Sequence, residues 1–226
     1  MCGRFHQQGF AQLIDFYDAF LGGGFSSAGI PGLGERFNIG PQQQVFTLRK
    51  LEDLADAFSA RWGLLPGWAK DEKLAYATFN ARSETVATKP TFRSAFKRKR
   101  CLIPALGYYE WTGPKGNKQP HYVTRADEQP FLFYGLWEQR DALTTCTVIT
   151  TDASPGIDWL HHRMPCIADP DPANNAVWLD PEFEDREHLL SLLKPTPADR
   201  LVTQAVSTFV NKVGNEGPEC LEPADK

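Results

Sequence analysis

The sequence lacks the features that direct a chain into or across a membrane. Among its 226 residues no stretch approaches the roughly 18 consecutive apolar residues of a membrane span, and the early residues lack a basic start followed by an apolar run. We therefore expect no membrane partner. A cytoplasmic, nucleoid-associated protein is expected in a bacterium, and a nuclear protein in a eukaryote.

Cysteine is scarce, and its spacing argues against two common scaffolds. The five cysteines are odd in number and none forms a Cys-x-x-Cys pair, so neither a disulfide framework nor a structural zinc site is indicated. A metal site made of His161, His162 and Cys166 is disfavoured because adjacent histidines in a loop rarely point at one ion. We expect reduced thiols, no metal and no cofactor.

The negative net charge of −4 conceals an uneven distribution of charge. Residues 1–125 hold 17 Lys and Arg against 10 Asp and Glu, a net of +7, whereas residues 126–226 hold 7 against 18, a net of −11. The basic residues are densest at 93–100. This run is typical of a surface that binds a polyanion and equally of a solvated helix face.

The pattern of apolar residues predicts an α+β fold in a single domain, 1–226, with a core of about 1–217. Helical spacing predicts helices at 10–21, 172–179 and 181–193, and the glycine-rich segment 22–34 predicts a flexible loop. A hairpin tip is expected at 113–117. Without regular alternation of strands and helices, the sheet should be mostly antiparallel and barrel-like, with flanking helices. Strands are predicted at 45–48, 58–62, 101–111, 121–125, 131–137, 144–151, 164–168 and 201–206.

The second residue is the most informative position. Removal of Met1 would leave Cys2 with its α-amine and thiol on one residue, and each has an ordinary pKa near enough to neutrality to act as a nucleophile. Such a pair condenses with an aldehyde to an imine, which the sulfur then closes into a thiazolidine. The alternative is that Cys2 is a small apolar residue of the first strand.

Other residues that could carry chemistry are far apart in the sequence. Glu110 follows an apolar run and precedes Trp111, so burial would raise its pKa toward neutrality, as acid-base catalysis requires; a strand-end glutamate that faces water is the alternative. His161 could donate a proton. Asn80 could orient a substrate hydroxyl. We expect Trp62 to be buried and Trp68, on a Pro-Gly turn, to be exposed for stacking on a base.

Taken together and in order, six motifs resemble the SRAP family (SOS-response-associated peptidase), and the tail 210–212 is similar too. The resemblance extends from residue 1 to about 217, essentially the whole chain. The six motifs are Met1-Cys2-Gly3-Arg4-Phe5, Arg36-Phe37-Asn38-Ile39-Gly40-Pro41, Trp62-Gly63-Leu64-Leu65-Pro66, Asn80-Ala81-Arg82-Ser83-Glu84-Thr85, Gly107-Tyr108-Tyr109-Glu110-Trp111 and His161-His162-Arg163-Met164-Pro165.

The resemblance implies a monomer that senses and shields abasic sites in single-stranded DNA during the DNA damage (SOS) response. After peptidase-like self-removal of Met1, Cys2 would form a thiazolidine crosslink with the opened abasic sugar, with a weak lyase side activity. The implied catalytic residues are Cys2, Asn80, Glu110 and His161. The implied DNA-binding residues are Arg4, Asn38, Trp68, Arg82, Arg93, Thr150 and Arg163.

Ala69 departs from this pattern, because relatives often place a second aromatic residue there. Two other functions remain open. A glutamine amidotransferase also starts with Met-Cys-Gly and uses the cysteine thiolate as its nucleophile. A non-covalent single-strand binding module would use Arg and Trp side chains alone and leave Cys2 inert.

Overall fold

The computed structural model describes residues 2–9, 14–21, 25–26, 34–51, 54–71 and 77–224. Most of the segment 22–34 and the start of the predicted helix 10–21 lie outside the described residues. The helices are α1 (Ile14–Leu21), α2 (Arg93–Arg98), α3 (Pro172–Leu179) and α4 (Arg186–Ser191), with 3-10 turns η2 (Ala198–Arg200), η3 (Thr208–Asn211) and η4 (Pro218–Cys220). The strands are β1 (Phe5–Gln7), β2 (Phe25–Ser26), β3 (Arg36–Ile39), β4 (Gln44–Leu51), β5 (Leu54–Trp62), β6 (Asn80–Arg82), β7 (Arg100–Ala105), β8 (Gly107–Thr112), β9 (Gln119–Arg125), β10 (Phe131–Arg140), β11 (Leu143–Asp152), β12 (Arg163–Pro165) and β13 (Leu201–Ala205).

Five strands close into a barrel, as the sequence predicts. They run in the order β5-β4-β7-β10-β11, and a parallel pairing between β11 and β5 closes the ring, with Cys146 opposite Trp62. β11 also carries β6 and β12, which pair with it through Asn80 opposite Val148 and Pro165 opposite Thr150. The neighbours in the ring are otherwise antiparallel. The α+β, barrel-like prediction is confirmed.

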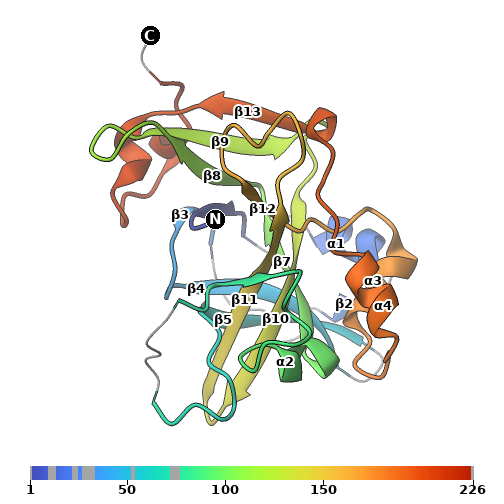
Figure 1. Cartoon of the computed structure of the whole chain (residues 1–226). Coiled ribbons are helices and arrows are strands. Elements are labelled where there is room, and N and C mark those ends of the chain that lie inside the picture. The colour runs from blue at the N-terminus through green and yellow to red at the C-terminus, as the bar shows by residue number, and fades with distance from the viewer. Residues whose placement is uncertain are drawn as a thin grey trace.

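A second, five-stranded antiparallel sheet, in the order β13-β9-β8-β1-β3, lies above the barrel in Figure 1. β8 and β9 form the hairpin whose tip the sequence predicts at 113–117. The prediction of one strand over 101–111 is wrong, because the chain passes at Leu106 from β7 in the barrel to β8 in this sheet. Gly107 permits the passage, since a Cβ there would lie 2.3 Å from the Tyr122 ring.

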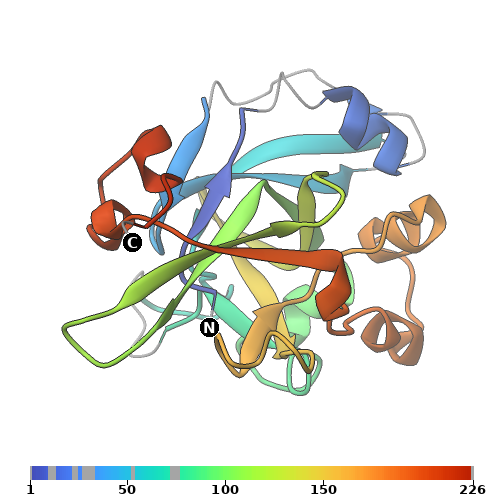
Figure 2. The ribbon, with the colours of Figure 1, turned by 90° about the horizontal axis from the view of Figure 1, so that it is seen from above.

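Alternation along the barrel strands separates two apolar cores. On β10, Phe131 and Phe133 pack in the core that includes Cys2 and Trp62, whereas Leu132 and Tyr134 pack in the core that includes Trp178 of α3. α1, α3 and α4 gather on one side of the barrel (Figures 1 and 2). α3 matches its predicted bounds, and α4 is shorter than predicted. In the described parts of the chain, no helix is long and apolar enough to cross a membrane.

Candidate active site

Antiparallel pairing between β1 and β8 places Cys2 beside Glu110. Phe5 lies opposite Tyr108, and the Tyr109 N–H donates to the Arg4 carbonyl at 3.0 Å. Because antiparallel registers run in opposite directions, the chain before Phe5 follows β8 toward Glu110. Two motifs that are a hundred residues apart in the sequence therefore meet at one point of the sheet.

Cys2 is completely buried, in the same core as Phe5, Tyr108 and Trp62. Burial is the main cause that raises the pKa of its thiol well above the ordinary range, and the negative charge of Glu110 adds to the rise. In the chain that still carries Met1 the thiol is therefore protonated at neutral pH, and the partly ionised thiol expected after removal of Met1 stays a prediction. The sulfur needs a base to take its proton when it reacts.

Glu110 fits that need. Its carboxyl is 5% exposed, so the water-facing alternative is wrong. Burial raises its pKa to about 6. A carboxyl with this pKa exchanges a proton readily near neutral pH, in either direction.

Asn80 and His161 reach the same place from two strands that flank β11. The Asn80 side-chain N–H, at the start of β6, donates to the Cys2 carbonyl at 2.7 Å. His161 precedes β12, and its Nδ1 accepts the Arg163 backbone N–H at 2.9 Å. A neutral His161 ring therefore carries its proton on Nε2. Burial lowers the pKa of this ring to about 4, so it is neutral at pH 7.

Glu110 and His161 line one small pocket together with Tyr108, Arg163 and Met164. The structure thus brings all four predicted catalytic residues together: a cysteine, a carboxyl that titrates near neutrality, a neutral imidazole and an amide donor. Such a set can bind a small electrophile at Cys2 and move protons around it. Within the described ranges, no three His, Cys, Asp or Glu residues gather as a metal site.

Arg163 is buried, and its guanidinium already donates hydrogen bonds to several protein groups. Its guanidinium donates to both carboxylate oxygens of Glu84, at 2.7 and 3.0 Å, to Asp152 at 2.6 Å and to the Thr150 carbonyl at 2.6 Å. Thr150 itself is 0% exposed. Both side chains are buried, Arg163 in the wall of the small pocket beside Glu110 and His161, and their expected DNA contacts stay predictions.

Asn38 is likewise buried. Its side-chain nitrogen lies within hydrogen-bond distance of the carbonyls of Val210, Lys212 and Asn215, and its oxygen accepts from Arg4. Asn38 therefore fastens the segment 210–215 to the second sheet. Arg4 is half-buried; its guanidinium also donates to the Val210 carbonyl at 3.1 Å and lies 5.5 Å from the centre of the Trp111 ring.

Trp68 and Arg93 line one open groove. Trp68 is 57% exposed and Trp62 is fully buried, so the expected exposure of one and burial of the other are confirmed, while stacking of Trp68 on a base stays a prediction. The groove is also lined by Ala87, Thr88, Pro90, Ser94 and Lys97. Arg82 is exposed on β6, two residues from Asn80, so it lies between the Cys2 site and this groove along the chain.

The basic run 93–100 divides into two parts. Arg98 pairs with Glu182 and Glu184, and Lys99 pairs with Glu138. Arg100 is 2% exposed and donates to backbone carbonyls, among them that of Trp178 at 2.6 Å. Only the first part of the run, with Arg93 and Lys97, presents cations to the groove.

Lys118 is a residue that the sequence analysis missed. It lines a second open groove on the Cys2 side with Gly3, Arg4, Trp111, Gly116 and Asn211. Its positive charge also reaches Glu110, whose pKa it lowers against the larger effect of burial. The sequence contained a signal for Lys118, because this residue directly follows the predicted hairpin tip at 113–117. The strand that leads into this tip, β8, carries Glu110.

Comparisons with known proteins agree with this architecture. The family model "SOS response associated peptidase (SRAP)" matches residues 1–213. The chain is 37% identical to "Abasic site processing protein YoqW" of Bacillus subtilis, over 98% of this chain and 99% of that one. It is 32% identical to "Abasic site processing protein HMCES" of Gallus gallus, over 84% and 66%. A crystal structure of a protein from Bacteroides thetaiotaomicron superposes with a TM-score of 0.78 at 25% identity, over 98% and 100%. The chain belongs to the SRAP family.

Proposed function

We propose that this protein processes abasic sites in single-stranded DNA by forming a covalent crosslink through Cys2. The observation that carries the proposal is the convergence of Asn80, Glu110 and His161 on a cysteine that becomes the first residue once Met1 is removed. The names of its relatives, abasic site processing proteins, supply the substrate class.

The reaction follows from the two nucleophiles of an N-terminal cysteine. The opened abasic sugar presents an aldehyde, and the Cys2 amine adds to its carbon and expels one water to form an imine. The Cys2 sulfur then adds to the same carbon. The S–C bond forms as the thiol proton leaves for a base and a proton reaches the nitrogen, which gives a neutral thiazolidine. Before ring closure the imine also permits β-elimination of the 3′ phosphate, a weak lyase activity.

The neighbouring residues divide the proton transfers. Glu110 takes the thiol proton, because its carboxyl has a pKa of about 6 and the buried thiol does not ionise by itself. His161 is neutral, so its Nε2–H donates a hydrogen bond to the sugar oxygen as the ring opens and stabilises the negative charge that develops there, without giving up the proton. Asn80 holds the Cys2 carbonyl and so fixes the amine and sulfur relative to Glu110. Glu110 also acts in the self-removal of Met1 by activating water.

The two open grooves provide a path for the strand on either side of Cys2. Arg4 and Lys118 line one groove, and Trp68 and Arg93 line the other. The exposed Lys118 and Arg93 and the half-buried Arg4 bind flanking phosphates, and Trp68 stacks on an unpaired base. A single strand fits this path because its damaged sugar need not be extracted from a duplex.

The test is a denaturing gel of the Met1-processed protein with an oligonucleotide that carries one abasic site. We expect a shifted covalent band for the natural chain, no band for Cys2→Ala, and at most a labile imine for Cys2→Ser, whose hydroxyl closes the ring poorly. Salt-sensitive binding without any covalent product would instead support the non-covalent module. Hydrolysis of glutamine would support the amidotransferase.

A further inference from the structure

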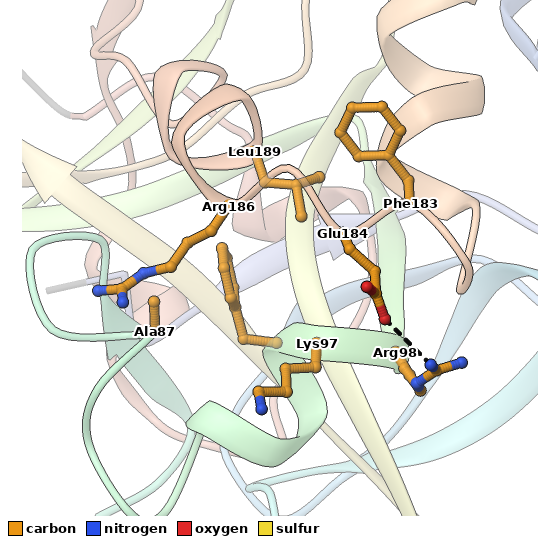
Figure 3. Close-up of a pocket in the computed structure, with 8 residues that line it drawn as sticks. Ala87, Lys97, Arg98, Phe183, Glu184, Arg186 and Leu189 are labelled. Carbon is orange, nitrogen blue, oxygen red and sulfur yellow. Dashed lines mark hydrogen bonds and ion pairs between the residues drawn. The ribbon is translucent and has the colours of Figure 1, made fainter.

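A second cavity opens at the far end of the Trp68 groove, where no function has been placed. It lies between α2 and α4 and encloses about 310 Å³. Its inner wall is apolar, with Phe96 and Leu189 buried and Phe183 half-buried. In Figure 3 Phe183 and Leu189 lie beside an opening that Lys97, Arg98 and Arg186 border. We call this cavity the α2–α4 pocket.

The α2–α4 pocket continues the groove that begins at Trp68. Ala87 and Lys97 line both hollows, so the two share a wall. Ala87 lies in the turns that follow β6, the strand that begins at Asn80. A strand that passes Trp68 and Arg93 along the shared wall therefore reaches this pocket.

The rim of the α2–α4 pocket carries the charge that a nucleic acid needs. Arg98 pairs with Glu184 across it, the contact drawn dashed in Figure 3. Lys97 and Arg186 are both exposed, and their side chains form no ion pair with any residue that the structure describes. The net charge of the lining is therefore +2, above an aromatic and aliphatic floor. Cations around an apolar floor match a nucleotide, whose phosphate is anionic and whose base is flat and apolar on its faces.

We propose that the α2–α4 pocket holds one unpaired, undamaged nucleotide of the same DNA strand, a few positions from the abasic site. Its base enters against Phe96 and Phe183, and its phosphate is bound by Arg186 and Lys97. The pocket thus anchors the flanking strand while Cys2 reacts. This inference rests on the proposed function, since it takes single-stranded DNA as the substrate.

The experiment measures equilibrium binding of strands that contain a tetrahydrofuran abasic analogue, which has no aldehyde and cannot crosslink. The analogue is flanked by about two nucleotides on each side, and either the 5′ or the 3′ side is extended to about eight, within the range of single-strand site sizes. We expect extension on one side alone to strengthen binding by roughly tenfold, the effect of one stacked base.

Two variants separate charge from shape. Arg186→Ala should lose most of that gain and lower the slope of log K against log salt by about 0.7, the contribution of one phosphate contact on a single strand. Ala87→Leu places a larger side chain in the wall that the two hollows share. The extended strand should then bind no more tightly than the short strand, with the short strand's slope of log K against log salt. Arg200→Ala is the matched control, an exposed arginine on η2 outside the pocket lining. Thermal unfolding of each variant checks that it is folded.

The results discriminate clearly. If extension adds no affinity to the natural chain, or if both pocket variants keep the full gain, the pocket does not hold a nucleotide. Crosslinking of the short strand with a natural abasic site separates this outcome from failure of the proposed function. A natural chain that crosslinks while the pocket variants bind long strands normally overturns only the pocket, and a natural chain that never crosslinks overturns the function.

Discussion

Replacement of Arg163 tests whether this residue organises the site or binds DNA. Its side chain is 6% exposed, and the guanidinium donates to Glu84, Asp152 and the Thr150 carbonyl. Its backbone N–H holds His161 in one tautomer. We therefore expect Arg163→Met to act on the position of the 150–163 region and on stability, not on a phosphate contact.

The expected magnitude follows from these contacts. Loss of a buried arginine from a paired site costs about 3–5 kcal/mol when its partners stay buried. Here the side chains of Glu84 and Asp152 are 47% and 83% exposed, so water replaces much of what they lose. We expect a loss of about 2–3 kcal/mol in the free energy of unfolding, close to the value of hydrogen bonds to charged groups. Arg163→Lys should recover only part of it, since an ammonium cannot bind both Glu84 oxygens at once.

The assay is urea unfolding together with the salt dependence of binding to the uncrosslinkable strand. Glu84→Gln should also destabilise the chain, and the double variant should lose less than the sum of the two single losses, because both changes break one contact. The salt dependence of DNA binding should stay unchanged in Arg163→Met, in Glu84→Gln and in the double variant. An Arg163→Met chain of unaltered stability whose salt slope falls by about 0.7 would refute this reasoning and make Arg163 a phosphate ligand.

The remaining predictions concern the stacking residue, the general base and the buried amide. Trp68→Ala should weaken binding of single strands by about 1–3 kcal/mol without lowering stability, because the ring is 57% exposed; fluorescence anisotropy and urea unfolding measure the two. The crosslinking rate should rise as pH increases through about 6, where Glu110 becomes a carboxylate, and Glu110→Gln should slow the reaction and remove this inflection from the pH-rate profile. Because burial raises the pKa of Glu110, ionisation of its carboxyl destabilises the folded chain above pH 6. Glu110→Gln should therefore be more stable than the natural chain by up to about 2 kcal/mol at pH 8 and by little at pH 4. Urea titrations of chains with the same N-terminus measure the difference. Asn38→Ala should cost about 2–4 kcal/mol in the same titration, because it releases three backbone carbonyls and Arg4, while the salt slope of DNA binding stays as it is.

Much of the barrel could be predicted from the sequence, because its strands are runs rich in β-branched and aromatic residues that are buried on both faces. β10 and β11 each extend a predicted strand by a few residues. β1, β3 and β6 are only three or four residues long, too short to show a period, and were not predicted. The division of 101–111 between two sheets depends on the fit of Gly107 against Tyr122, a contact that no local pattern reveals.

For the candidate site too, part could be predicted from the sequence and part depends on the fold. The ordered motifs identified Cys2, Asn80, Glu110 and His161, which the structure brings together. The family resemblance also suggested DNA contacts for Asn38, Thr150 and Arg163, whose side chains are buried. The pairing of Arg163 with Glu84, 79 residues earlier, arises only when β6 and β12 lie on opposite sides of β11. Motifs show which residues a family shares, and only the fold shows which of them face solvent.

The most direct test of the central claim is peptide mass spectrometry of the protein after reaction with an abasic strand. The account predicts that Met1 is absent and that the sugar remnant is attached at Cys2, in an adduct that forms without borohydride and survives it as a thiazolidine. An adduct on a lysine, or no adduct on a chain that is folded and processed, would contradict it.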